Sequence, residues 1–114
     1  MTNCIFCKIA AGEIPSAFLY HDDHIVAFND RIHQAPQHLL IIPRKHIATL
    51  NDLTPDDNLL LGNLTLTAQH LAKELGMADD GYRLVMNCNA DGGQAVFHIH
   101  MHLLGGRQMS WPPG

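Results

Sequence analysis

Apolar residues recur at helical spacing in two stretches of the chain. The first stretch, residues 5–11, is short, and Gly12 with Pro15 would end a helix there. The second begins at residues 54–57, Thr-Pro-Asp-Asp, which combine an N-cap hydroxyl, a first-turn proline and two carboxylates beside the free amides of a helix start. Gly76 offers the left-handed stop of this longer helix. Its apolar face is formed by Leu60, Leu64, Ala68, Leu71, Ala72 and Leu75.

Shorter apolar or alternating stretches predict β-strands. They cover residues 18–20, 25–28, 39–42, 82–87 and 97–104. Polar residues 21–24 predict a hairpin connection between the first two strands, and the glycine-containing residues 91–94 predict a turn before the last one. Three strands, one long helix and two further strands predict an α+β domain, in which the helix covers one face of an antiparallel sheet.

Length, charge and composition narrow the class of protein. A chain of 114 residues, 46% of them hydrophobic, suits one domain over residues 1–114, with an irregular C-terminal tail at about 105–114. Its 7 basic residues against 11 acidic ones are scattered, which argues against a nucleic-acid polymer as partner. No apolar run approaches the roughly 20 residues that span a bilayer, so we expect no membrane partner. No secretion signal or disulfide framework is recognisable, and we expect a cytoplasmic protein.

The chain is rich in histidine, with 9 in all, and three of them alternate with apolar residues near its end. Because a strand has a period of two, His98, His100 and His102 would project from one face. Ile99 and Met101, with Leu103 beyond them, would then face the core. From these residues alone, three solvated histidines on an exposed strand face remain an alternative to a catalytic constellation.

This block resembles the H-φ-H-φ-H-φ-φ signature of the histidine-triad (HIT) superfamily, and the rest of the chain resembles its Hint branch, the purine nucleoside phosphoramidases. Matching segments are residues 5–9, 14–16, 34–38, 43–47, 80–83, 92–94 and 105–114. The resemblance covers nearly the whole chain. It implies a HIT-like antiparallel five-stranded sheet with one long helix and a short N-terminal helix, and a homodimer whose two sheets join into one continuous sheet.

The resemblance also implies roles for four histidines. His100 would be the nucleophile that takes the nucleotidyl group of a purine nucleoside 5′-phosphoramidate, of AMP or GMP type, before water releases it. Its attacking nitrogen must be unprotonated, and we expect a backbone carbonyl to hold the proton of the other ring nitrogen. His102 would assist departure of the leaving group, His98 completes the triad, and His38 would give a supporting hydrogen bond. The plain alternative for His38 is an ordinary histidine at the end of a strand.

Substrate contacts follow from the same resemblance. Asp30 would accept hydrogen bonds from the ribose hydroxyls, because a carboxylate offers two acceptor oxygens. Near the phosphate we expect Asn87, Gly93 and Gln94, although a Gly-Gly pair can also be only a turn. The purine pocket walls would be Ile5, Phe6, Ile9, Phe28 and Leu40, which without the resemblance read as core residues. Trp111, in the terminal Trp-Pro-Pro-Gly, would reach towards the partner's active site, the alternative being a disordered tail.

Two positions depart from the family pattern. Arg31 stands where relatives carry an aliphatic residue beside the base, so base preference could be altered or the ribose edge could be more polar. Ala95 stands where some relatives have a serine that touches the phosphate.

Cys4-x-x-Cys7 is a common way to supply two thiolates to a tetrahedral metal ion. A complete site needs two further ligands, and relatives with this cysteine pair imply His46 and His98. We expect a closed structural zinc site that takes no part in the chemistry, so that no cofactor is needed for catalysis. The alternative is a pair of reduced surface cysteines.

Three other functions remain to be weighed against the phosphoramidate hydrolase. The first is a nucleotide- or zinc-binding interaction protein whose triad binds without turnover. The second is a dinucleoside polyphosphate hydrolase or nucleotidyl transferase of another HIT branch, against which the Hint-like C-terminal end argues. The third, a metalloenzyme with all three triad histidines on one catalytic metal, is disfavoured because the cysteine pair competes for His98.

Overall fold

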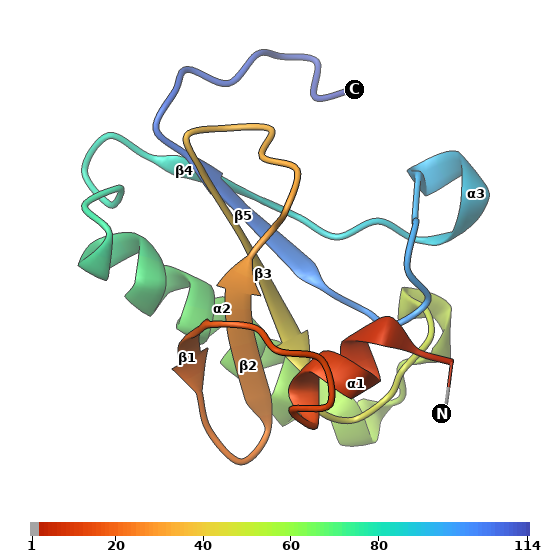
Figure 1. The fold of residues 1–114 in the computed structure, drawn as a ribbon. Helices are drawn as coiled ribbons and strands as arrows, with labels where there is room; N and C mark the ends of the chain where they lie inside the picture. The colour runs from red at the N-terminus through yellow and green to blue at the C-terminus, as the bar shows by residue number, and fades with distance from the viewer. Residues whose placement is uncertain (1–2) are drawn as a thin grey trace.

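The computed structural model describes residues 3–114, whose five strands form one antiparallel sheet (Figure 1). The strand order is β1-β2-β3-β5-β4, so the last strand of the chain inserts between the third and fourth. The strands are β1 (Phe18–His21), β2 (Ile25–Asn29), β3 (Gln37–Pro43), β4 (Tyr82–Val85) and β5 (Met101–Gly105). The sequence thus predicted the α+β class correctly, and the first four strands form close to their expected positions.

One helix covers each face of the sheet. The long helix α2 (Asn58–Glu74) buries Leu64, Ala68 and Leu71 against one face, together with Ile25 and Leu39 of the strands. The short helix α1 (Ile5–Ala10) packs on the opposite face. There the apolar cluster consists of Phe6, Ile9, Ala10, Val26, Phe28, Leu40 and Ile42. Alternate residues of β2 and β3 therefore contribute to the two apolar clusters, as the period of two in a strand requires.

The start of α2 lies where the capping residues indicated. Residues Pro55–Asp57 form a single 3₁₀ turn (η2), and the Thr54 backbone N–H donates to Asp57 Oδ2 at 3.0 Å. Lys45 Nζ donates to the other oxygen of Asp57 at 2.8 Å. The helix ends before Gly76, whose φ of 78° is the left-handed conformation that glycine adopts without strain. Leu75, expected on the apolar face, is instead exposed, because the helix has already ended at Glu74.

The histidine block departs from the prediction of a strand over residues 97–104. Strand β5 begins only at Met101, and β4 correspondingly ends at Val85, opposite His102, rather than at Asn87. Pro43, the last residue of β3, lacks the amide that would extend the β3 ladder. The Ile99 N–H donates to Ile47 O at 2.8 Å instead. The alternation still holds, since Ile99, Met101 and Leu103 are 2%, 6% and 0% exposed.

The segment expected to be a plain turn over residues 91–94 is also different. Residues Asn89–Gly92 form a short helical turn, α3, which ends at Gly93 with φ of 77° (Figure 1). Asn89, its first residue, has a positive φ of 58°, a left-handed conformation that asparagine adopts more readily than most residues. The C-terminal tail lies against the domain: Arg83 Nη2 donates to Ser110 O at 2.9 Å and Arg107 Nε to Gln34 O at 3.0 Å. Within residues 3–114, no helix is both long and apolar enough to cross a membrane.

Candidate active site

A cavity of about 700 Å³ is lined by residues of α1 and of the sheet, and by the histidine segment. All five expected apolar wall residues line it, on α1, β2 and β3. Its polar wall includes His100 and His102 with Asp30, Asn87 and Gly93. An apolar cleft with a few convergent polar groups is the usual form of a small-molecule site. Trp111, which is 82% exposed, and Gln94 do not line the cavity.

His100 is held so that one ring nitrogen is free. Its Nδ1 lies 2.7 Å from the carbonyl oxygen of His98, and because a carbonyl only accepts, Nδ1 carries the proton. In the neutral ring, Nε2 then keeps its lone pair. The edge-to-face contact with Phe6, at 5.1 Å between ring centroids and 88° between planes, holds the ring from the side of α1. The geometry therefore supplies an oriented nitrogen nucleophile on the wall of the cavity.

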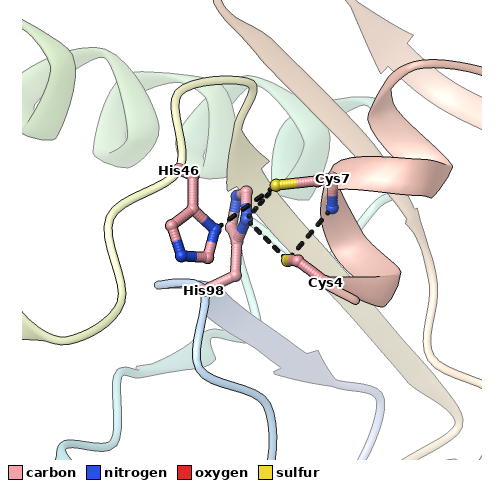
Figure 2. Close-up of side chains that lie close together, drawn as sticks. All are labelled: Cys4, Cys7, His46 and His98. Atoms are coloured by element: carbon pink, nitrogen blue, oxygen red, sulfur yellow. Dashed lines mark hydrogen bonds between the residues drawn. The ribbon is translucent and has the colours of Figure 1, made fainter. Parts of the chain in front are cut away.

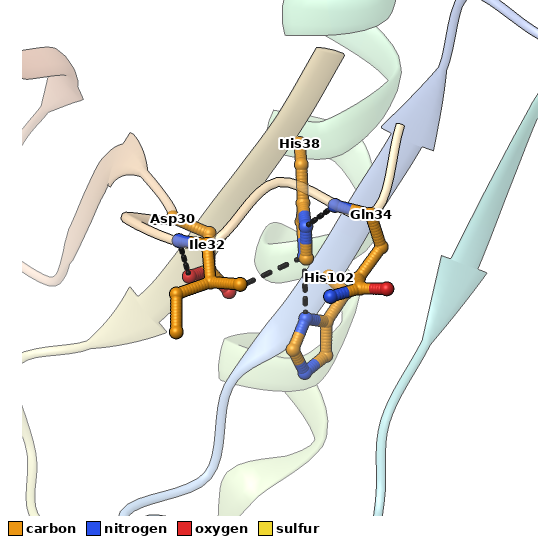
Figure 3. A network of polar contacts seen from close by, with 5 residues as sticks. All are labelled: Asp30, Ile32, Gln34, His38 and His102. Atoms are coloured by element: carbon orange, nitrogen blue, oxygen red, sulfur yellow. Dashed lines mark hydrogen bonds and ion pairs between the residues drawn. The ribbon is translucent and has the colours of Figure 1, made fainter. Parts of the chain in front are cut away.

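His102 receives a hydrogen bond whose direction can be deduced (Figure 3). The backbone N–H of Gln34 donates to His38 Nδ1 at 3.1 Å, so the proton of neutral His38 lies on Nε2. That Nε2 lies 2.9 Å from His102 Nδ1 and 3.4 Å from Asp30 Oδ2. His102 Nδ1 consequently accepts, and His102 carries its own proton on Nε2. His38 is thus more than a histidine at a strand end, because it orients His102 as a donor.

Burial keeps this histidine pair neutral. It lowers the pKa of His102 to about 4, with His100 and His38 adding to the effect. Burial also lowers the pKa of His38, against the attraction of Asp30. Both rings are therefore uncharged at pH 7, as the chain of donors and acceptors requires.

Acidification should destabilise the protein through His102. Its folded pKa of about 4 lies below the ordinary value of 6.5, so the unfolded chain binds more protons between these values. Stability should rise with pH across this window and be lost as the pH falls through it. We expect the free energy of unfolding, from urea titrations between pH 7.5 and pH 4.5, to fall more steeply for wild type than for His102→Gln. Parallel curves of unfolding free energy against pH for the two proteins would contradict this account. Release of a bound metal by acid would affect both proteins equally and so would not produce a difference between them.

Gln94 makes contacts that sequence reasoning did not find. Its side chain is buried and bonds only to backbone: Oε1 accepts from Asn89 N at 2.9 Å, and Nε2 donates to Ala48 O at 2.8 Å and Val96 O at 3.1 Å. The amide therefore fixes the turn beside the cavity. No local sequence signal separates a glutamine that binds substrate from one that joins three backbone segments.

Other cavity residues were also missed. They are Ile14, Pro15, Ser16, Asn29, Ile32 and Val96. The first three form one of the segments that match the Hint pattern, which was a signal for their importance although it gave them no role. Arg31 and Ala95, the two departures from that pattern, both line the cavity.

The two N-terminal cysteines meet the two expected histidines at the end of α1 (Figure 2). Cys4 Sγ lies 3.3 Å from His98 Nδ1, while Cys7 Sγ lies 3.3 Å from His46 Nδ1 and 3.5 Å from His98 Nδ1. The four ligand atoms all lie within 4.8 Å of one another. Two sulfurs and two imidazole nitrogens converging in this way fit a tetrahedral metal site. This group of residues can therefore bind a metal.

The protonation of His98 also suits a metal. His98 Nε2 lies 2.7 Å from Pro43 O, so it carries the proton and leaves Nδ1 with a lone pair facing the cysteines. Burial, reinforced by Cys4, raises the pKa of the Cys7 thiol to about 11 in the metal-free chain. Metal binding would release such thiol protons.

The triad histidines do not converge on one metal ion. His98 belongs to the cysteine group, whereas His102 lies with Asp30 and His38 in a second group of close ligand atoms. In that second group, His38 Nε2 and His102 Nδ1 are already joined to each other by a hydrogen bond. Within residues 3–114, His100 belongs to neither group. The division agrees with separate roles for the metal site and the nucleophile.

The fold and the arrangement of histidines are those of a histidine-triad protein, and comparison with known proteins gives the same class. The HIT domain model matches residues 11–109, and the chain belongs to the HIT family. It is a HIT family hydrolase homologous to purine nucleoside phosphoramidase: the enzyme of that name from Escherichia coli K12 is 51% identical over 105 residues, covering 92% of this chain and 88% of the relative.

Solved structures give the same result. A HIT family hydrolase from Legionella pneumophila Philadelphia 1 superposes with a TM-score of 0.97 at 60% identity, covering 98% of this chain and 100% of that one. A histidine triad nucleotide-binding protein from Candida albicans superposes with a TM-score of 0.81 at 35% identity, covering 96% and 83% of the two chains. The HIT-like fold expected from the sequence is thus confirmed.

Proposed function

We propose that this HIT hydrolase cleaves the P–N bond of purine nucleoside 5′-phosphoramidates through a nucleotidyl-histidine intermediate. The observation that carries the proposal is the bond from His100 Nδ1 to the His98 carbonyl, which leaves Nε2 free at the cavity. The homologous phosphoramidase from Escherichia coli supports this choice of reaction and of nucleotide substrates.

The reaction divides into two displacements at phosphorus. In the first, His100 Nε2 forms a bond to the α-phosphorus while the P–N bond breaks and the amine departs. His102 Nε2–H, oriented through His38, hydrogen-bonds the leaving nitrogen or a phosphate oxygen. In the second, water attacks phosphorus and the bond to Nε2 breaks. Overall, the water's hydroxyl ends on phosphorus, and its remaining proton balances the one that the amine takes up.

The cavity walls suit a purine ribonucleotide. The apolar residues of α1, β2 and β3 would offer a surface for the base, and Asp30, which lines the same cavity, would accept from the ribose hydroxyls. The Ile32 N–H already donates to Asp30 Oδ1 at 3.0 Å, which fixes the carboxylate. Gly93 and Asn87 line the same cavity as His100 and would contact the phosphate, while Gln94 would act there by holding the turn.

Release of a fluorescent amine from an adenosine 5′-phosphoramidate tests this function directly. We expect turnover by the wild-type protein and, on rapid quenching, a nucleotidyl adduct in its intact mass. Nucleotide binding without turnover would reject the hydrolase of phosphoramidates and favour a nucleotide-binding protein. Turnover confined to dinucleoside polyphosphates would instead identify the other HIT activity.

Arg31 is the residue that we expect to set base preference. It is exposed, lines the cavity beside Asp30, and makes no ion pair among residues 3–114. A guanidinium pairs well with the O6 and N7 acceptors of guanine, whereas adenine offers a donor in place of O6. We expect Arg31→Ile to lower kcat/KM for guanosine phosphoramidates about tenfold while changing it less than about twofold for adenosine phosphoramidates. Equal losses for both bases would place the guanidinium at the ribose or phosphate instead.

The metal that we propose for the cysteine–histidine group is zinc, in a structural role. A closed site with four protein ligands leaves no position for water or substrate, so the metal itself would form no bond to the reacting groups. Free cysteines and such a site suit a reducing compartment, and we propose a cytoplasmic location.

We also propose a homodimer. Strand β4 is an edge of the sheet, and all four of its residues are partly buried. Pairing two copies of this edge would give a continuous sheet and cover unpaired backbone groups. The exposed Trp111 would then reach towards the partner's cavity. No membrane or nucleic-acid polymer is proposed as a partner.

A further inference from the structure

We propose that the metal centre positions His100 for attack, in addition to stabilising the fold. The inference rests on the proposed function in two respects, because it takes His100 as the nucleophile and zinc as the metal held by the four ligands. It concerns three connections between the metal-ligand residues and the ring of His100 or the segment that carries it.

The first connection runs through His98, which serves both sites with different groups. Its Nδ1 faces the cysteines, and its carbonyl oxygen accepts from His100 Nδ1 at 2.7 Å. Its Nε2 is held by Pro43 O, and the residue is fully buried. A bond from Nδ1 to the metal would leave the His98 ring little freedom to rotate. It would also restrict the His98 backbone, whose carbonyl fixes the tautomer of His100.

The second connection runs through α1. Phe6 lies between the two cysteine ligands and packs edge-on against both His98, at 6.0 Å between centroids, and His100, at 5.1 Å. Helix α1 has only 6 residues, well below the roughly 12–15 that form a stable helix alone. Ligation of Cys4 and Cys7 would therefore hold the ring of Phe6 against His100.

The third connection runs through the segment 46–48. His46 is followed by Ile47, whose carbonyl accepts from the Ile99 N–H at 2.8 Å. Ala48 O accepts from Gln94 Nε2 at 2.8 Å. The remaining metal ligand thus lies beside the backbone that flanks His100 on its N-terminal side. All four ligands are therefore within two residues of a group that contacts the triad segment.

The experiment measures the His100 ring itself at one fixed pH. In zinc-loaded protein, ¹⁵N spectra should show a single Nδ1–H tautomer for His100. After zinc removal, at a temperature where the protein remains folded, we expect shifts averaged between both tautomers. We also expect kcat to fall about 10- to 100-fold, as when supporting partners of a site are lost, and more than AMP affinity falls.

Variants separate positioning from general stability. His46→Ala should behave as the metal-free protein, and His46→Cys, which keeps four ligands, should restore both the tautomer and kcat. His70→Ala on the exposed surface of α2 is the matched control and should leave both unchanged. Unchanged His100 shifts in folded, metal-free protein would overturn the proposal, as would equal losses of kcat and AMP affinity.

A second variant keeps the test decisive if the metal-free protein does not fold. Phe6→Leu retains all four ligands, and zinc content can be confirmed by metal analysis. We expect altered His100 shifts and a lower kcat with zinc bound, and unchanged values of both would overturn the proposal. If no phosphoramidate is turned over by wild type, the proposed function fails, while the ring spectra still test whether the metal fixes His100.

Discussion

His100→Ala and His100→Gly should each lower the rate of amine release by roughly a thousandfold or more, because neither side chain can form the covalent intermediate. The nucleotidyl adduct seen by intact mass on wild type should be missing from both. Nucleotide affinity should persist, since the apolar walls and Asp30 remain. A variant that kept a rate close to wild type would assign the nucleophile to another group, and His70→Ala serves again as the control.

Chelation of the metal should lower the melting temperature by roughly 15 °C. A ligand present at about a thousandfold above its dissociation constant adds about 4 kcal/mol, and each kcal/mol shifts a domain of this size by about 4 °C or more. The gain comes from joining ligands that are 94 positions apart, Cys4 and His98, which the unfolded chain does not bring together.

The matched control for this measurement is Cys88, the one cysteine outside the metal-ligand group. Differential scanning calorimetry should show a large decrease for Cys4→Ser and little change for Cys88→Ser. If both cysteine variants and the chelated protein melt like wild type, Cys4 and Cys7 are ordinary reduced thiols and the metal proposal is wrong.

Local patterns predicted the elements well where a feature depends on neighbours in sequence. The 3₁₀ turn that follows Thr54 and leads into α2, the buried leucine face of α2 and the Gly76 stop all follow from spacing and capping chemistry. The late start of β5 does not, because it depends on Pro43 and on the bond from Ile99 to Ile47, which belong to distant parts of the chain. Propensity and periodicity give no information about such contacts.

The site shows the same division. The residue types of the triad and the cysteine pair were visible in the sequence, but His46 was assigned only by resemblance to relatives. The partner of His38 Nδ1 is a backbone amide, that of Gln34, and every residue except proline has one. For the same reason the three backbone bonds of Gln94 could not be foreseen.

The bond from Gln34 to His38 gives the histidine pair a fixed polarity. Of all groups in that chain of bonds, only the Gln34 N–H can neither accept a hydrogen bond nor titrate in the physiological range. It therefore fixes which ring nitrogen of His38, and in turn of His102, carries the proton. This role depends on the backbone N–H at position 34 and not on the side chain. Proline at position 34 would remove this N–H and free His38 Nδ1 to take the proton. His102 would then carry its proton on Nδ1, and its Nε2 would present an acceptor to the leaving group in place of a donor.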